Sequence, residues 1–150
     1  MSKFVYPAIF SWSSEDCTYY VTFPDIESCF TDGDSIAEAM ENASDALNLM
    51  LYYTEKTGEA LPEPTPLEKV PVPANGFVNL VMADTAAYQE VIERENNPIN
   101  YARKKAGMNI KQLAALLDAP YRTVQEWNAG RRMPPKWVQN LIVDKIQATV

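Results

Sequence analysis

A chain of 150 residues with a hydrophobic content of 47% is long and apolar enough for one domain or two small ones. No apolar run approaches the ~18 residues of a membrane span, and the first residues lack the apolar core of a signal peptide. We therefore expect a cytoplasmic protein with no membrane partner. The sequence contains no His, which excludes His-containing catalytic triads and the common His-based metal sites.

The net charge of −7 conceals two halves of opposite sign. Residues 1–97 contain 4 Lys and Arg against 17 Asp and Glu, a net charge of −13, whereas residues 98–150 contain 9 against 3, a net charge of +6. This division indicates two partners, a basic protein for the acidic half and nucleic acid for the basic half. An acidic surface that only aids solubility remains the alternative for the first half.

Three strands are expected at the start of the chain. Residues 4–12 and 17–23 are rich in β-branched and aromatic side chains, which is typical of a hairpin, and a short third strand is expected over residues 28–31. Pro7 cannot donate a hydrogen bond to a neighbouring strand, so we place the first strand near a sheet edge. Cys17 and Cys29 lack CxxC spacing and are expected to be buried free thiols.

A helix is expected over residues 36–54. Ser35 is its predicted N-cap, with Glu38 completing a capping box. Its buried face is predicted by one apolar stripe: Ile36, Ala39, Met40, Ala43, Ala46, Leu47, Met50 and Leu51. Five prolines then predict an extended segment over residues 61–76. A strand over residues 77–82 and a short helix through residue 95, capped by Asp84 or Thr85, complete the first half.

Residues 109–135 contain two short helical patterns with a tight joint between them. Val124 and Trp127 lie three residues apart on the second pattern, and Gly130 ends it. If these two side chains face inward, the outer face of that helix carries Tyr121, Arg122, Gln125 and Asn128. A polar helix supported by a small apolar core is what reading the major groove of DNA requires.

This stretch resembles the helix-turn-helix of the Cro/XRE-type repressor family. The matching or closely similar positions are Met108, Asn109, Leu113, Ala114, Leu117, Thr123, Val124, Trp127, Gly130, Arg132 and Pro134. Asp118 occupies the place of the turn glycine of that family, and Ile110 the place of a Gln near the start of the first helix. The resemblance implies that residues 98–150 form an all-α domain that binds double-stranded operator DNA.

The second helix supplies the predicted base-reading residues, which are Tyr121, Arg122, Gln125 and Glu126. The predicted phosphate contacts are Lys111, Gln112, Asn128, Arg131, Arg132 and Lys136. A merely solvated helix face is the alternative. Trp127, Trp137 and Leu141 are assigned to the core, although part of the wide apolar face of the last helix is available for a dimer interface. Homodimer and homotetramer both remain open.

A second resemblance covers about half of the chain. It rests on three strings and two residue pairs: YPAIF at residues 6–10, YVTFPDI at 20–26, CFTDGDS at 29–35, and the pairs at 38–39 and 42–43. Together these segments resemble the HicB antitoxin family. Where that family has Pro-Gly before its Cys, this chain has Glu27-Ser28. The resemblance implies a partial RNase-H-like fold over residues 1–97, without nuclease chemistry, that binds and silences a small basic HicA-type toxin acting on mRNA. It also implies repression of its own operon by a C-terminal DNA-binding domain.

The predicted fold is therefore α+β, with an N-terminal β-β-β-α-β domain followed by a helix-turn-helix domain. The predicted toxin-binding residues are Asp25, Glu27, Asp32 and Asp34. A metal-dependent nuclease is the enzymatic alternative, but the candidate carboxylates Asp16 and Asp25 lie at opposite ends of one predicted strand, so we expect no enzyme, metal or cofactor. The remaining alternative is a stand-alone repressor whose N-terminal domain senses a small ligand.

Overall fold

Four antiparallel strands form one sheet in the order β3-β2-β1-β4 in the computed structural model, which describes residues 3–150. The strands are β1 (Lys3–Ser13), β2 (Thr18–Thr22), β3 (Phe30–Gly33) and β4 (Gly76–Asp84). With the helices of the C-terminal part, this sheet confirms the predicted α+β class. The finer prediction of a partial RNase-H-like fold stays a prediction.

The prediction that the first strand lies near a sheet edge is wrong, because β1 lies between β2 and β4. Pro7 is tolerated there because β2 pairs with β1 only from Ile9 onward, whereas Pro7 pairs with Leu80 of β4. At Pro7, β1 therefore has a neighbouring strand on the β4 side only. On the β2 side there is no strand that would need a hydrogen bond from an N–H at this position, so proline is tolerated.

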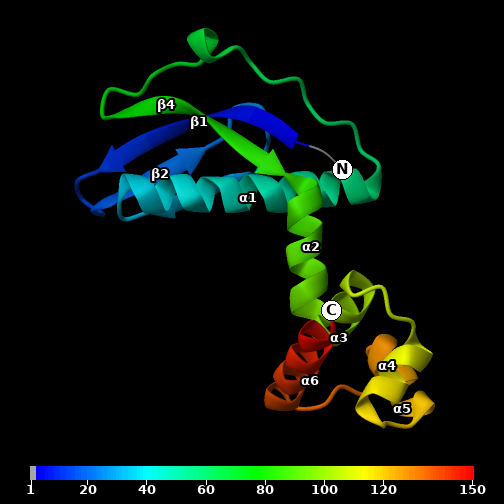
Figure 1. Ribbon diagram of the computed structural model, residues 1–150. Coiled ribbons are helices and arrows are strands. Elements are labelled where there is room, and N and C mark those ends of the chain that lie inside the picture. Colours follow the sequence, from blue (N-terminus) through cyan, green and yellow to red (C-terminus); the bar gives the residue numbers. More distant parts are fainter. Residues whose placement is uncertain (1–2) are drawn as a thin grey trace. The chain divides into compact units, whose positions relative to one another are not determined.

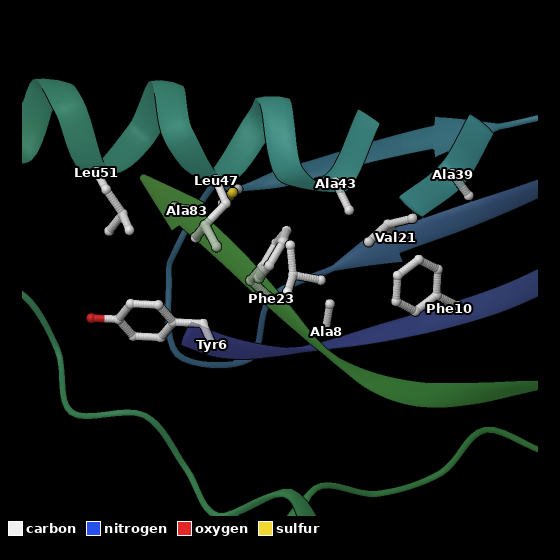
Figure 2. Close-up of a cluster of buried hydrophobic side chains, with 12 residues drawn as sticks. Tyr6, Ala8, Phe10, Val21, Phe23, Ala39, Ala43, Leu47, Leu51 and Ala83 are labelled. Atoms are coloured by element: carbon white, nitrogen blue, oxygen red, sulfur yellow. The ribbon is translucent and has the colours of Figure 1, made fainter. Parts of the chain in front are cut away.

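The helix α1 (Ile36–Thr57) covers one face of the sheet (Figure 1). Its buried residues Ala39, Ala43, Leu47 and Leu51 recur every four positions and pack on Tyr6, Ala8, Phe10 and Val21 of the strands (Figure 2). Alanines on this line let the helix approach the sheet closely. The predicted stripe is too wide, since Ile36 and Met40 are 47% and 38% exposed at the rim of the buried line.

The start of α1 is held by the predicted cap. The Ser35 hydroxyl accepts a hydrogen bond from the Glu38 backbone N–H at 3.1 Å, as a capping box requires. The Glu38 carboxylate, however, accepts from the Asp34 N–H at 3.1 Å, one residue before the position expected for the box. Gly58 ends the helix in the left-handed conformation.

The free edge of β4 is partly closed by neighbouring side chains. Ser44 of α1 donates its hydroxyl hydrogen to the Met82 carbonyl at 3.0 Å, and Asn48 of α1 accepts from the Asp84 N–H at 2.9 Å. The Leu80 N–H donates to the side chain of Asn79 at 2.9 Å. Backbone groups that would otherwise invite another strand are therefore occupied at three points along this edge.

The proline-rich segment, residues 59–75, runs on the side of the sheet opposite α1 (Figure 1), and we call it the strap. Inside it lies one 3₁₀ turn, η1 (Leu67–Lys69), which the sequence did not predict. The Tyr6 hydroxyl donates to the Pro62 carbonyl at 2.6 Å, and the Asp25 carboxylate accepts from both the N–H and the hydroxyl of Thr65. These contacts fix the course of the strap.

The second part of the chain is helical. Its elements are α2 (Thr85–Asn96), α3 (Pro98–Lys105), α4 (Ile110–Leu117), α5 (Tyr121–Asn128) and α6 (Lys136–Thr149). The contacts divide the chain into two units, which we call unit 1 (up to Gln89) and unit 2 (Glu90–Val150). The division falls within α2, and the domain boundary at residues 97 and 98 stays a prediction. Within residues 3–150, no helix has the length and apolar run that a membrane crossing requires.

The core of unit 2 is formed by Ile99, Leu113, Val124, Ile142 and Ile146. Trp127 packs against it, as predicted. The core assignment of Trp137 and Leu141 is wrong, since they are 67% and 59% exposed on α6. The buried line of α6 runs through Ile142 and Ile146 instead, one residue further around the helix.

The two cysteines are free thiols in different environments. Cys29 is buried, and burial raises the pKa of its thiol to about 11, so this thiol stays protonated at neutral pH. The expectation of burial is wrong for Cys17, which is exposed in the turn between β1 and β2. The backbone of Cys17 is left-handed, with φ at 52°.

Candidate functional site

Local interactions fix both ends of α4, the helix before the turn to α5. The Asn109 side chain accepts from the Gln112 N–H at 2.7 Å, and the Gln112 side chain accepts from the Asn109 N–H at 2.8 Å. This reciprocal capping box fixes the start of α4. Asp118 ends α4 in the left-handed conformation, with φ at 52°, which Asp adopts more readily than most residues. The helix α5 begins three residues later, at Tyr121.

The helix α5 has the orientation that the sequence predicts. Val124 is 1% exposed and faces the core, whereas Tyr121, Arg122 and Gln125 are exposed. A hollow of about 500 Å³ beside this face is lined by both Arg122 and Arg132. Three further predicted contacts, Lys111, Gln112 and Lys136, are exposed as well. The contacts of all these residues with DNA stay predictions.

Two of the predicted residues engage each other. The Arg131 guanidinium donates to both carboxylate oxygens of Glu126, from Nε at 3.0 Å and from a terminal nitrogen at 3.2 Å. The hydrogen bond from Arg131 lowers the pKa of Glu126 below its ordinary value, so the carboxylate stays ionised at neutral pH. The pair thus offsets the positive charge of Arg131 with the carboxylate of Glu126, close to the other predicted phosphate contacts.

Asn128, a predicted phosphate contact placed on the outer face of α5, is instead half-buried and turns toward α3. Its side-chain oxygen accepts from Arg103 at 3.0 Å, and Arg103 also donates to the Asn100 side chain at 2.8 Å and the Met108 carbonyl at 2.7 Å. Asn97, the N-cap of α3, donates to the Trp127 carbonyl at 2.9 Å. The end of α5 is therefore held by two side chains, Arg103 of α3 and Asn97 of the α3 N-cap.

The sequence did not single out Arg103. It begins the run Arg103-Lys104-Lys105, in which Lys104 and Lys105 are exposed, and such a run is typical of a solvated surface. What distinguishes Arg103 from the two lysines is its position on α3. It lies four residues after Ile99 and next to Ala102, the two buried residues of this helix.

The four predicted toxin-binding carboxylates have different surroundings. Asp25 is half-buried and is engaged by Thr65 of the strap. Asp34 accepts from the Thr18 hydroxyl at 3.4 Å at the start of α1. Glu27 and Asp32 are exposed, and Asp32 lies on β3. Asp25 therefore has a structural role whatever else it does.

Within residues 3–150, no three side chains of His, Cys, Asp or Glu are grouped in a way that could hold a metal ion. The described residues present two candidate surfaces: a polar helix face with basic residues in unit 2, and an acidic, partly apolar surface in unit 1.

A family model of the HicB-like antitoxins of bacterial toxin–antitoxin systems matches residues 6–105, two thirds of the chain. The chain belongs to the HicB-like antitoxin family. Antitoxin HicB of Escherichia coli K12 is 31% identical over 81 residues, which cover 51% of this chain and 59% of the relative. An uncharacterised 14.9 kDa protein of Haemophilus phage HP1 is 37% identical over 51 residues, 34% of this chain and 38% of the phage protein.

This HicB-like chain thus spans less than two thirds of the length of the curated relatives that it matches. A solved toxin–antitoxin complex from Streptococcus pneumoniae contains a chain with the same fold, with a TM-score of 0.54 and 22% identity. The likeness covers 77% of this chain and 95% of that one. The family match ends at residue 105, the last residue of α3, so α4–α6 lie beyond it.

Proposed function

We propose that the chain is the antitoxin of a toxin–antitoxin pair, and that its acidic first half binds and neutralises a HicA-type mRNA interferase toxin. Membership of the HicB-like family over residues 6–105 is the observation that carries this proposal. Electrostatics supports it, because unit 1 contains 3 Lys and Arg against 14 Asp and Glu. Such a surface accelerates the encounter with a basic protein. The proposal assigns no reaction to the chain itself.

The second half, in this proposal, is a Cro/XRE-type helix-turn-helix domain that binds operator DNA and represses the chain's own operon. The exposed side chains of α5 support it, since Arg122 and Gln125 can each make two hydrogen bonds with the edge of one base. Exposed Lys111, Arg132 and Lys136 would contact phosphates, which makes the affinity depend on salt.

Self-association through α6 completes the proposal. Trp137 and Leu141, one helical turn apart, give α6 an exposed apolar face. Joining two copies there would pair two α5 helices for half-sites one DNA turn apart. A homotetramer would require a further contact between such dimers.

Two measurements test the two halves separately. Full-length protein, coexpressed with the product of the small reading frame next to its gene, should copurify with it and suppress its ribonuclease activity. Binding to the promoter region of the same operon should weaken about tenfold on Arg122→Ala, with a loss of base preference at one position. The matched control is Lys145→Ala, an exposed residue of α6 outside the proposed contacts. Unchanged affinity and preference in Arg122→Ala would refute the DNA-binding orientation.

A further inference from the structure

The outer face of the sheet of unit 1, turned away from α1, is the side along which the strap runs, and it carries exposed apolar side chains that the strap leaves open. The register places Val5 opposite Met82, Tyr20 opposite Asp32, and Thr22 opposite Phe30, and directly opposed residues point to the same face. Their neighbours Val21 and Phe10 point to the buried face. The exposed large apolar side chains of the outer face are Val5 (44%), Tyr20 (43%), Phe30 (71%), Leu80 (47%) and Met82 (57%).

Charge separates the two ends of this outer face. At the β1–β4 end, Lys3 lies opposite Asp84, so the two charges offset each other. At the β2–β3 end, Tyr20 is surrounded by acids: its hydroxyl hydrogen-bonds the Asp16 carboxylate and Asp32 is its cross-strand neighbour. The hydrogen bond to Asp16, burial and the negative charges of Asp16, Asp32 and Glu15 raise the pKa of the Tyr20 hydroxyl.

We propose that Tyr20 and Phe30, with Glu15, Asp16 and Asp32 beside them, form the docking surface for a cationic protein partner. The inference rests on the proposed function, because it assigns this surface to the HicA-type toxin. Phe30 is the apolar anchor, since it is 71% exposed, more than any other aromatic side chain of residues 3–150. An Arg or Lys of the partner would lie over an aromatic ring and pair with Asp16 or Asp32.

Other occupants fit this surface less well. Nucleic acid is disfavoured because three carboxylates would face its phosphates. A second copy of the chain is disfavoured because a two-fold contact would bring the same acids of both copies together. The surface also differs from the predicted set of Asp25, Glu27, Asp32 and Asp34, of which it retains Asp32 only.

The test measures the dissociation constant between the full-length protein and the purified product of the adjacent toxin reading frame. Phe30→Ala should weaken binding at least about tenfold, as an anchor in the centre of an interface does. Two matched controls, Tyr53→Ala on α1 (59% exposed) and Met82→Ala at the other end of the outer face, should stay within about twofold. Thermal unfolding of each variant checks that unit 1 remains folded.

The charge part is tested with the double variant Asp16→Asn/Asp32→Asn against Glu41→Gln/Asp45→Asn on the exposed side of α1. The first pair should slow association and flatten its salt dependence, and the second should do so less. Tight binding by wild type together with unchanged binding by Phe30→Ala and Asp16→Asn/Asp32→Asn would overturn this surface and leave the antitoxin role intact. Absence of wild-type binding would overturn both, and self-association abolished by Phe30→Ala would assign the surface to a second copy.

Discussion

Arg103 of α3 donates a hydrogen bond to the side-chain oxygen of Asn128, the last residue of α5, at 3.0 Å. The three acceptors of this guanidinium are neutral oxygens, from Asn100, Met108 and Asn128, and its Nε is buried without a partner. One side chain thus joins α3, the turn before α4 and the end of α5. This junction helps to hold α5 in the orientation on which base reading would depend.

Replacing Arg103 by Ala should destabilise unit 2 strongly. The substitution leaves three partly buried acceptors without their donor, and we expect the free energy of unfolding to fall by about 2–4 kcal/mol. The measurement is denaturant unfolding of the full-length protein. Its neighbour Lys104, which is exposed, provides the control, because Lys104→Ala should change stability by no more than about 0.5 kcal/mol. Equal effects of the two substitutions would contradict the role assigned to Arg103.

Removing the charge of Glu126 should strengthen DNA binding. Glu126→Gln releases Arg131 from its ion pair and removes a negative charge near the phosphates, so affinity should rise a few-fold and the slope of log K against log salt should steepen by about 1. Asp144→Asn, an exposed charge on α6, is the control. If Glu126 reads a base instead, the variant will lose sequence preference.

The same pair predicts a pH dependence. Because Arg131 lowers the pKa of Glu126, the ion pair is fully formed above the ordinary Glu value of about 4.3 and is lost only as the pH falls through the lower folded value. The difference in DNA affinity between wild type and Glu126→Gln should therefore be constant from about pH 5 to 8. Titration of binding over this range checks it, and a difference that shrinks near pH 6 would contradict it.

Asp25 should matter more for the stability of unit 1 than for binding of the proposed toxin. Asp25→Ala removes the acceptor of the Thr65 N–H and hydroxyl, so we expect a loss of about 1–3 kcal/mol and faster proteolysis within the strap. Glu27→Ala, two residues along and exposed, should leave the melting temperature unchanged. A variant Asp25→Ala that melts like wild type would return this residue to the list of binding candidates.

Gly33 should tolerate no side chain, for a reason of space. A Cβ there would lie 2.4 Å from the backbone nitrogen of Ala39, and a helix backbone cannot withdraw without losing the packing of α1 on the sheet. We expect Gly33→Ala to cost about 3 kcal/mol or more. Gly58→Ala, where the added Cβ meets nothing but φ is +76°, should cost only about 1–2 kcal/mol, and calorimetry ranks the two.

Local signals predict much of this fold. The extent of α1, the cap at Ser35, the strand β4 and the inward face of α5 at Val124 all follow from residue spacing and capping chemistry. Sheet order does not, because β1 pairs with a strand more than 60 residues further along the chain, and no local pattern encodes that partner. Pro7 illustrates this. Proline indicates an edge strand, but here it lies in a central strand at a position where only one neighbouring strand is paired.

The errors come from tertiary context. The helix α3 was not predicted. Asn97 and Pro98 are its N-cap and first residue, but the same pair of residues is equally typical of a boundary between domains. Trp137 and Leu141 satisfy a helical apolar pattern but lie beside the buried line of α6. The same limit applies to the candidate surfaces. The exposure of Arg122 is predictable from the helical spacing to buried Val124. The contacts of Asn128 and Asp25 are not, because their partners lie 25 and 40 residues away in the chain.

The occupied edge of β4 has a consequence for the newly made chain. An exposed nine-residue strand bearing Leu80 and Met82 would act as a template for cross-β stacking between identical molecules at high local concentration on a polysome. Ser44 and Asn48 precede β4 in the chain, so both emerge from the ribosome before the strand they cover. Variants that lack both side chains should form fibrillar deposits before any loss of function becomes measurable.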